Sequence, residues 1–403
     1  MIPQGRNRGR AAVLLLVTLV ATSTATAQPS PSPEPLVPNE PSVSTASQGA
    51  QRGDTLEARH TPPLVANDSL SGERRPAWLR SLRFTPILDV IAHYEARGRK
   101  DDTGAADWYH EFDVPRAQVG ANAALHASHL NVLLETVRST SGGSLIGVAG
   151  ESIVIRVRNA FIGYALFDRL ELRGGVIPTL TIASLERAWG LRVLGPTGLE
   201  ASGLGSPADL GASALATLPA SFGWVGVAAV NGEGYTGREL NRGKTAEVAA
   251  VVRPLAAVSS RAMALALHAS YVAGSNGTGL ARADRITGGI TYATDAVGCG
   301  FATTYAIGVG DDGKKPSLLI DGFLRVEPWS KLVLGAHAVT RHRDLRVAGD
   351  RTTELTMAAG WRPTPPLEAL LAFELPFVAD GARATSPAPD SWRIRAVARF
   401  HLE

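Results

Sequence analysis

The stretch that decides the fold is Ser391–Glu403, "SWRIRAVARFHLE", in which apolar and basic side chains alternate. Successive side chains of a strand point to opposite sides, so a period of two predicts an extended strand with two unlike faces. One face is wholly apolar and consists of Trp392, Ile394, Ala396, Ala398, Phe400 and Leu402. The other face carries Arg393, Arg395, Val397, Arg399 and His401. In a soluble sandwich this second face would meet water, which is the ordinary alternative.

The same division recurs along the chain from Leu82 onward. Apolar and polar side chains alternate in residues 82–96, 170–176, 318–326 and 366–375. The polar faces of the two middle stretches hold Glu171, Arg173, Asp321 and Arg325. About sixteen such runs can be counted, an even number, as single-chain bacterial barrels require.

The connections between these runs alternate between short and long. Short turns are predicted at Asp168-Arg169, Pro219 to Ser221, Pro328 to Ser330 and Pro363 to Pro366. Longer loops are predicted at Arg97 to Glu111, Ser139 to Glu151, Ile182 to Asp209, Asn231 to Lys244, Gly274 to Arg285, Gly308 to Pro316, Arg341 to Thr353 and Pro376 to Asp390. Outer-membrane barrels of Gram-negative bacteria have tight periplasmic turns and long outer loops. The sequence therefore predicts an all-β fold, a transmembrane antiparallel up-and-down β-barrel over residues 82–403, with both termini in the periplasm.

A barrel explains the arginine face of the last strand. If the apolar face meets lipid, the arginines must line an aqueous interior, because a lipid-facing Arg near the midplane costs roughly 2–4 kcal/mol. A register slip of one residue would expose all of them together, so the pairing is strongly fixed. Aromatic rings favour the membrane interface, and four fall near predicted periplasmic strand ends: Phe167, Trp329, Trp361 and Phe400.

The N-terminus has the features of an export signal. Arg6, Arg8 and Arg10 precede an apolar stretch, and Ala25-Thr26-Ala27 resembles a cleavage site, so residues 1–27 are predicted to be a signal peptide. Residues 28–80 are rich in Pro and Ser and are predicted to be a disordered periplasmic segment. Removing the three signal arginines from the net charge of +3 leaves a mature chain near zero, which gives no support for nucleic-acid binding.

Several segments resemble the phosphate-selective porin O and P family of outer-membrane porins. They are "RVRNAFIGYALFDRLELRGGVIP" at 156–178, "LERA" at 185–188, "AAVNGEGY" at 228–235 and "GKTAEVAAVVRPL" at 243–255. The resemblance extends over residues 82–403. It implies a porin of about sixteen strands, usually trimeric, with one loop folded into the lumen.

A channel also follows from the residues themselves. "IVIRVRNAF" at 153–161 places Arg156 and Arg158 on one face, and the next strand contributes Arg173 through a tight turn, which predicts a basic patch. Arginine stays charged at all relevant pH and contacts carboxylate or phosphate oxygens. The predicted lumen-facing residues are Arg156, Arg158, Glu171, Arg173, Asp321, Arg325, Arg393, Arg395 and Arg399. The alternative is an ion-pair lattice that braces the wall with Glu171, Asp321, Glu247 and Glu374.

The longest loop, Ile182 to Asp209, is too apolar to float in solvent. An inward fold would make it a constriction loop, in which opposed charges create a transverse field. The residues expected in that ring are Glu186, Arg187, Arg192 and Glu200. Alternatively the loop caps the outer rim or packs against a neighbouring subunit.

These features predict a porin that passes small hydrophilic solutes by passive diffusion, with a preference for anions such as phosphate. No catalytic residue, metal site or cofactor is predicted: "GVGDDG" at 308–313 lacks a following helix, and His126, His129 and His342 lack metal-ligand spacing. A barrel-embedded hydrolase and a structural surface barrel without an open channel are the alternatives. The expected partners are small anionic or polar solutes, outer-membrane lipid, the barrel-assembly machinery and, through the resemblance, two further copies in a homotrimer.

Overall fold

A computed structural model describes residues 82–100, 106–138, 153–235, 243–276, 281–309, 314–385 and 392–402. The predicted signal peptide (1–27) and the predicted disordered segment (28–80) lie outside these residues. Within the described part of the chain, no helix is both long and apolar enough to cross a bilayer.

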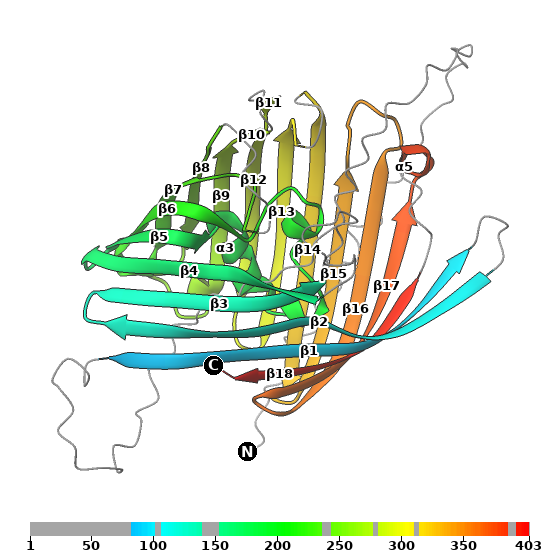
Figure 1. The fold of residues 1–403 in the computed structure, drawn as a ribbon, viewed down its shortest axis with the longest axis horizontal. Coiled ribbons are helices and arrows are strands. Elements are labelled where there is room, and N and C mark those ends of the chain that lie inside the picture. Colours follow the sequence, from blue (N-terminus) through cyan, green and yellow to red (C-terminus); the bar gives the residue numbers. More distant parts are fainter. Residues whose placement is uncertain are drawn as a thin grey trace, which may run out of the picture. The chain divides into compact units, whose positions relative to one another are not determined.

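Sixteen antiparallel strands close into one barrel (Figure 1), which confirms the predicted fold class. Each strand pairs with the barrel strands before and after it in the chain, and β18 pairs with β1 to close the ring. A separate two-stranded sheet lies in the connection between β9 and β12 and is formed by β10 (Ser275–Asn276) and β11 (Ala281–Arg282). The barrel strands are β1 (Arg83–Lys100), β2 (Ala106–Leu125), β3 (Ser128–Arg138), β4 (Ile153–Phe167), β5 (Leu170–Pro178), β6 (Ala208–Thr217), β7 (Gly223–Val230), β8 (Thr245–Val252), β9 (Leu265–Ala273), β12 (Asp284–Ala293), β13 (Val297–Ile307), β14 (Pro316–Trp329), β15 (Leu332–His342), β16 (Arg351–Thr364), β17 (Leu367–Val378) and β18 (Arg393–Leu402).

The closing strand has the two faces that its alternation predicts. Ile394, Ala396 and Ala398 are exposed on the outside of the barrel, whereas Arg395 and Val397 are buried inside it. The same division holds on β14 and β17, where the buried polar residues are Asp321, Arg325, Glu368 and Glu374. Apolar side chains therefore cover the outer surface, and most of the charge lies in the interior.

The predicted short turns are confirmed to within two residues. They lie at Asp168–Arg169, at the short helix η2 (Pro219–Ser221), and at residues 330–331 and 365–366. The connections at His126–Ala127, 253–264 and 294–296 lie at the same end of the barrel and are not predicted by the sequence. His126 adopts the left-handed conformation, φ 55°, which His tolerates better than most residues. We call this end the short-turn end and the opposite one the long-loop end.

The first long loop is shorter than predicted. Residues 97–111 read as polar loop, yet β1 runs to Lys100 and β2 begins at Ala106. The polar residues pair across the two strands: Arg97 Nη2 lies 3.3 Å from Glu111 Oε1, and the Arg97 guanidinium lies 4.4 Å from the centre of the Tyr109 ring. Charged residues that resemble a loop in sequence thus extend the hairpin.

Aromatic side chains surround the short-turn end of the barrel. Phe167, Trp329 and Trp361 are exposed on the outer surface at or near the last residues of their strands, as predicted, and Phe400 lies close to the end of β18. Amphipathic rings at this level suit the boundary between lipid and water. This band is therefore typical of a strand barrel that spans a membrane.

Candidate pore and its inward-folded segment

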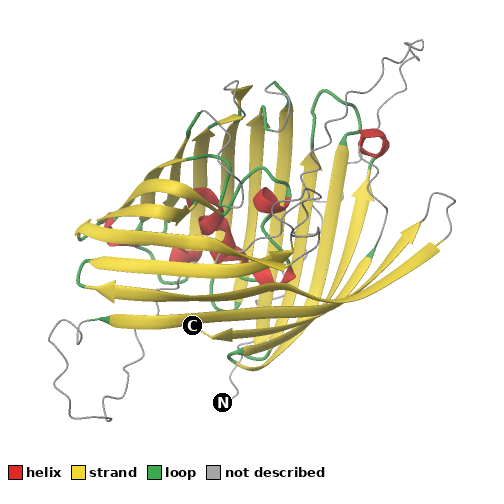
Figure 2. Cartoon of the chain, in the orientation of Figure 1, coloured by secondary structure: helices red, strands yellow, loops and turns green. Residues whose placement is uncertain are grey.

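The longest predicted loop folds into the barrel as three short helices (Figure 2): α3 (Leu180–Trp189), η1 (Arg192–Leu194) and α4 (Gly198–Ala201). At its start, the N–H groups of Leu180 and Thr181 donate to the carboxylate of Glu247 on β8, at 3.0 and 2.9 Å. Farther along, the Leu194 carbonyl accepts a hydrogen bond from Arg395 Nη2 on β18, at 2.6 Å. β8 and β18 are eight positions apart in the ring of sixteen strands, so the loop reaches opposite walls. We call residues 180–204 the cross-lumen segment.

Apolar packing holds the cross-lumen segment in place. Trp189 and Leu191 are at most 1% exposed and belong to a cluster with Phe323, Leu370 and Val397 from the inner wall. A second cluster joins Ile182, Leu199 and Leu204 of the segment to Ala306 and Leu319. Each fully buried side chain of this size contributes about 1.5–3 kcal/mol. The segment is therefore part of the barrel's core.

Three of the predicted constriction residues contact one another within this segment. The Arg192 guanidinium forms ion pairs with both Glu186 and Glu200, and all three side chains are buried. Burial lowers the pKa of Arg192 to about 10, although the negative charge of Glu200 acts to raise it. The guanidinium is therefore still charged at neutral pH. These three residues were predicted as opposed charges across the lumen, whereas here they pair with one another inside the folded loop. Arg187 is not part of this ion-pair group and is exposed on α3.

The predicted basic patch on β4 and β5 is not a single patch. Arg158 is the extra residue of a β-bulge, is fully buried, and lies 3.4 Å from Glu135 Oε2 through its Nη1. Arg173 pairs in register with Gly163, five residues along β4 from Arg158, which corresponds to roughly 16 Å. Arg173 contacts Glu171 instead, with Nε 2.6 Å from Oε1.

Glu135 is the centre of a polar network on this wall. It accepts hydrogen bonds from Gln118 Nε2 at 3.0 Å and from the Tyr235 hydroxyl, besides its ion pair with Arg158. Burial raises the pKa of Tyr235, so its hydroxyl keeps its proton and remains a donor. This network fixes the Arg158 side chain in the wall, where it is not exposed to solutes.

A belt of alternating charges follows the inner wall near the short-turn end. Ion pairs join Asp89 to Arg116 and Arg399, at 3.3 and 2.7 Å. The belt continues through Arg399–Glu368, Glu368–Arg362, Arg362–Glu327 and Glu327–Arg325. Of the carboxylates expected to brace the wall, Glu374 contacts Arg393 and Arg395, while Asp321 accepts hydrogen bonds from His337 and from the Gly198 N–H. Most predicted lumen-facing arginines are therefore paired.

Three arginines at the long-loop end differ from this pattern, and the sequence did not single them out. Arg285 is the second residue of β12, Arg341 lies near the end of β15, and Arg343 directly follows that strand. Along the described chain, no carboxylate lies within ion-pair distance of any of the three, and each has a buried Nε atom that makes no hydrogen bond. The strand register places them in one row of the wall. Arg285 on β12 pairs with Ala306 on β13, and Ala306 pairs with Ser317 on β14, which lies next to the end of β15. Arg156 is the one predicted pore residue that also makes no ion pair with a described residue.

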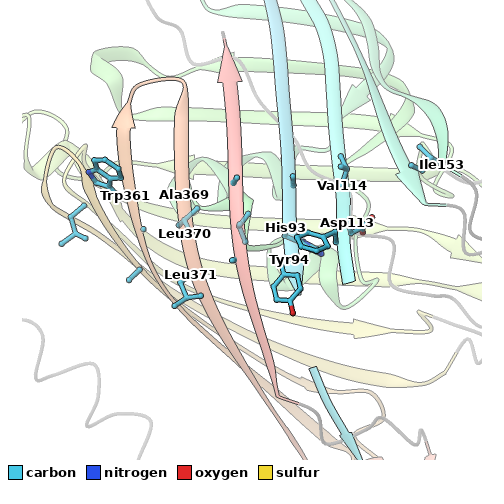
Figure 3. A pocket seen from close by; sticks show the side chains of 17 residues that line it. His93, Tyr94, Asp113, Val114, Ile153, Trp361, Ala369, Leu370 and Leu371 are labelled. Atoms are coloured by element: carbon cyan, nitrogen blue, oxygen red, sulfur yellow. The ribbon is translucent and has the colours of Figure 1, made fainter. Parts of the chain in front are cut away.

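An apolar concavity of about 940 Å³ lies over β1, β2 and β15–β18 (Figure 3). Ala369, Ala396 and Ala398 line it, and the larger rings of Tyr94 and Trp361 stand beside them. These side chains belong to the outward-facing set of their strands. Buried residues that face inward, among them His93 and Val397, also contribute to its lining.

The contribution of the cross-lumen packing can be measured by a pair of tryptophan variants. Trp189→Ala removes a side chain that is 1% exposed and is expected to destabilise the barrel by about 3–5 kcal/mol. Denaturant unfolding of the protein in detergent micelles, followed by circular dichroism, gives this value. Trp361→Ala is the matched control, because that ring is exposed on the outer surface. Equal stabilities of the two variants would contradict a core role for the segment.

Comparisons with known proteins identify the class of the fold. No family model matches this sequence, and no curated protein matches it. Among solved structures, the anion-selective porin from Comamonas acidovorans superposes with a TM-score of 0.54 at 12% identity over 80% of this chain and 100% of that one. OmpT, expressed in the outer membrane of Vibrio cholerae, superposes with a TM-score of 0.53 at 14% identity over 80% of this chain and 98% of that one. OprB from Pseudomonas putida superposes with a TM-score of 0.52 at 12% identity over 80% of this chain and 94% of that one. At these identities the likeness shows the fold alone, which is that of outer-membrane porins.

Proposed function

We propose that the protein is an outer-membrane porin that lets small hydrophilic solutes cross by passive diffusion and prefers anions such as phosphate. The observation that carries the preference is the row of Arg285, Arg341 and Arg343 at the long-loop end, without ion-pair partners among the described residues. Elsewhere in the interior, carboxylates and guanidinium groups largely cancel. In a chain whose mature net charge is near zero, such a local excess of positive charge sets the sign of the potential that an entering ion meets.

The proposal includes an orientation and an assembly. The short-turn end and both termini lie on the periplasmic side, as in bacterial barrels with short periplasmic turns. The resemblance of residues 156–178 and 243–255 to a family of trimeric porins supports a homotrimer. Chemical cross-linking of the protein in native membranes tests the assembly, and a ladder ending at three copies is expected. A single band at the monomer position under all cross-linker concentrations contradicts it.

A salt gradient across a planar bilayer tests the anion preference directly. The wild-type channel is expected to show a reversal potential on the anion side. The triple variant Arg285→Glu, Arg341→Glu and Arg343→Glu changes the local charge by six units and is expected to move the potential toward the cation side. The shift should grow at low salt, because the screening length increases from about 10 Å at 0.1 M to about 30 Å at 0.01 M.

The matched control applies the same change of charge at the other end of the barrel. Arg169, Arg261 and Lys331 are exposed in the turns and connections of the short-turn end, outside the barrel strands. Their replacement by Glu is expected to leave the reversal potential close to that of the wild type. If both triple variants shift the potential equally, net charge is responsible and the row of arginines is not the selectivity element.

A barrel without an open channel is the second candidate, and the packing of the cross-lumen segment favours it. The segment contacts opposite walls and joins two apolar clusters with them. A wild-type protein that inserts into bilayers without conducting would support this candidate. A wild-type conductance that rises with salt concentration and changes in the triple arginine variant would exclude it.

A further inference from the structure

Three potential metal ligands converge on the inner wall of β1 and β2. The donor atoms of His93, Glu95 and Glu111 all lie within 4.8 Å of one another. His93 and Glu95 are 6% and 3% exposed, whereas the Glu111 side chain is 29% exposed and leaves the group open to solvent. This group belongs neither to the belt at the short-turn end nor to the row of arginines.

Strand geometry explains why these side chains meet. His93 and Glu95 are two residues apart and so point to the same side of β1. The antiparallel register places Glu111 opposite Glu95, and Asp113 opposite His93, as Figure 3 shows for the latter pair. A β-bulge interrupts the pairing between Ile91 and His93, immediately beside the group. Bulges of this kind re-aim side chains and are frequent next to functional sites.

The charges around the group leave a small negative excess. Arg97 lies 3.6 Å from Glu95 and 3.3 Å from Glu111, and Arg393 and Arg395 face it from β18. Against these three guanidinium groups stand the carboxylates of Glu95, Glu111, Asp113 and Glu374. Three guanidinium groups and four carboxylates sum to about one negative charge. A divalent cation would reverse this excess, and Arg97 can then rest on the Tyr109 ring that it already contacts.

We propose that His93, Glu95 and Glu111 bind a first-row divalent transition-metal ion such as Zn²⁺, with Asp113 as a supporting group. An imidazole nitrogen with carboxylate oxygens is a donor set that suits these ions, whereas Mg²⁺ and Ca²⁺ prefer oxygen alone. The ligands come from two strands at a spacing that no sequence motif reveals, because only the hairpin register brings Glu111 to the other two.

Calorimetric titration of the full-length protein tests the site. Protein refolded in detergent and freed of metal by a chelator is titrated with Zn²⁺, and one ion per chain is expected to bind. Mg²⁺ and Ca²⁺ should bind far more weakly. His93→Ala and Glu111→Gln should each weaken Zn²⁺ binding by at least about tenfold, since loss of a supporting group alone typically costs 10- to 100-fold.

The control variant is His110→Ala. His110 precedes Glu111, is exposed on the opposite face of β2 and contacts Tyr94. This variant should bind Zn²⁺ like the wild type. Glu111→Gln keeps the shape of a partly exposed side chain, so it reports on binding even if His93→Ala does not fold. The proposal is overturned if the wild type binds no Zn²⁺, if Glu111→Gln binds it as tightly as the wild type, or if Ca²⁺ binds equally well.

Discussion

A variant that lacks residues 392–403 is expected to be absent from the membrane. β18 pairs with β1 on one side and with β17 on the other, so its deletion opens the ring and leaves two unpaired strand edges. Each unsatisfied backbone group in hydrocarbon costs several kcal/mol, and an open edge presents many of them. Heat-modifiable mobility on gels and extraction of membranes with urea measure the loss.

A second deletion separates this effect from simple shortening. Removal of residues 28–80 takes away a longer piece that is predicted to contribute no barrel strand. This variant is expected to assemble at wild-type level. Normal amounts of membrane-embedded protein without residues 392–403 would refute the closure of the barrel by β18.

Replacing most of the cross-lumen segment, residues 182–204, by a short Gly-Ser linker is expected to raise single-channel conductance severalfold. A barrel of sixteen strands is wide enough to hold an aqueous channel once its interior is not filled. The linker joins β5 to β6 without disturbing the ladder, and Arg395, which loses the Leu194 carbonyl, then meets water. Recordings in planar bilayers at high salt measure the change.

The variant Glu247→Gln is the companion for that experiment. It keeps the segment but weakens the hydrogen bonds that fix the start of α3 to β8. Open-channel noise is expected to rise while the mean conductance changes far less than in the linker variant. If the linker variant conducts like the wild type, ions do not pass the segment, and its packing serves stability alone.

The period of two carried most of the fold prediction. The alternation in residues 391–403 gave the correct face for Arg395 and for Ile394, because an antiparallel strand has only two sides. The tight turn at Asp168–Arg169 was also predicted correctly from the sequence. The loop between Arg97 and Glu111 was misread, since polar residues that pair across a hairpin have the composition of a loop.

The site was less predictable, because it depends on contacts between distant residues. Arg158 lies in a β-bulge and pairs with Glu135, and neither the bulge nor the partner has a signal in the local sequence. The folding of Glu186 and Glu200 onto Arg192 depends on the path of an irregular loop. Arg285, Arg341 and Arg343 were overlooked because only the register of four strands places them in one row.

The position of the cross-lumen segment also has a consequence for the order in which contacts form during folding. The hydrogen bond from Arg395 to the Leu194 carbonyl joins residues 201 positions apart in the chain, and Leu191 packs in the cluster that contains Val397. Contacts of such long range form late in folding, because the intervening chain must first be ordered. The segment lies in the middle of the sequence, but its contacts with Arg395 and Val397 require β18, the last strand of the chain. These contacts of the segment with the wall therefore form only once β18 is in place.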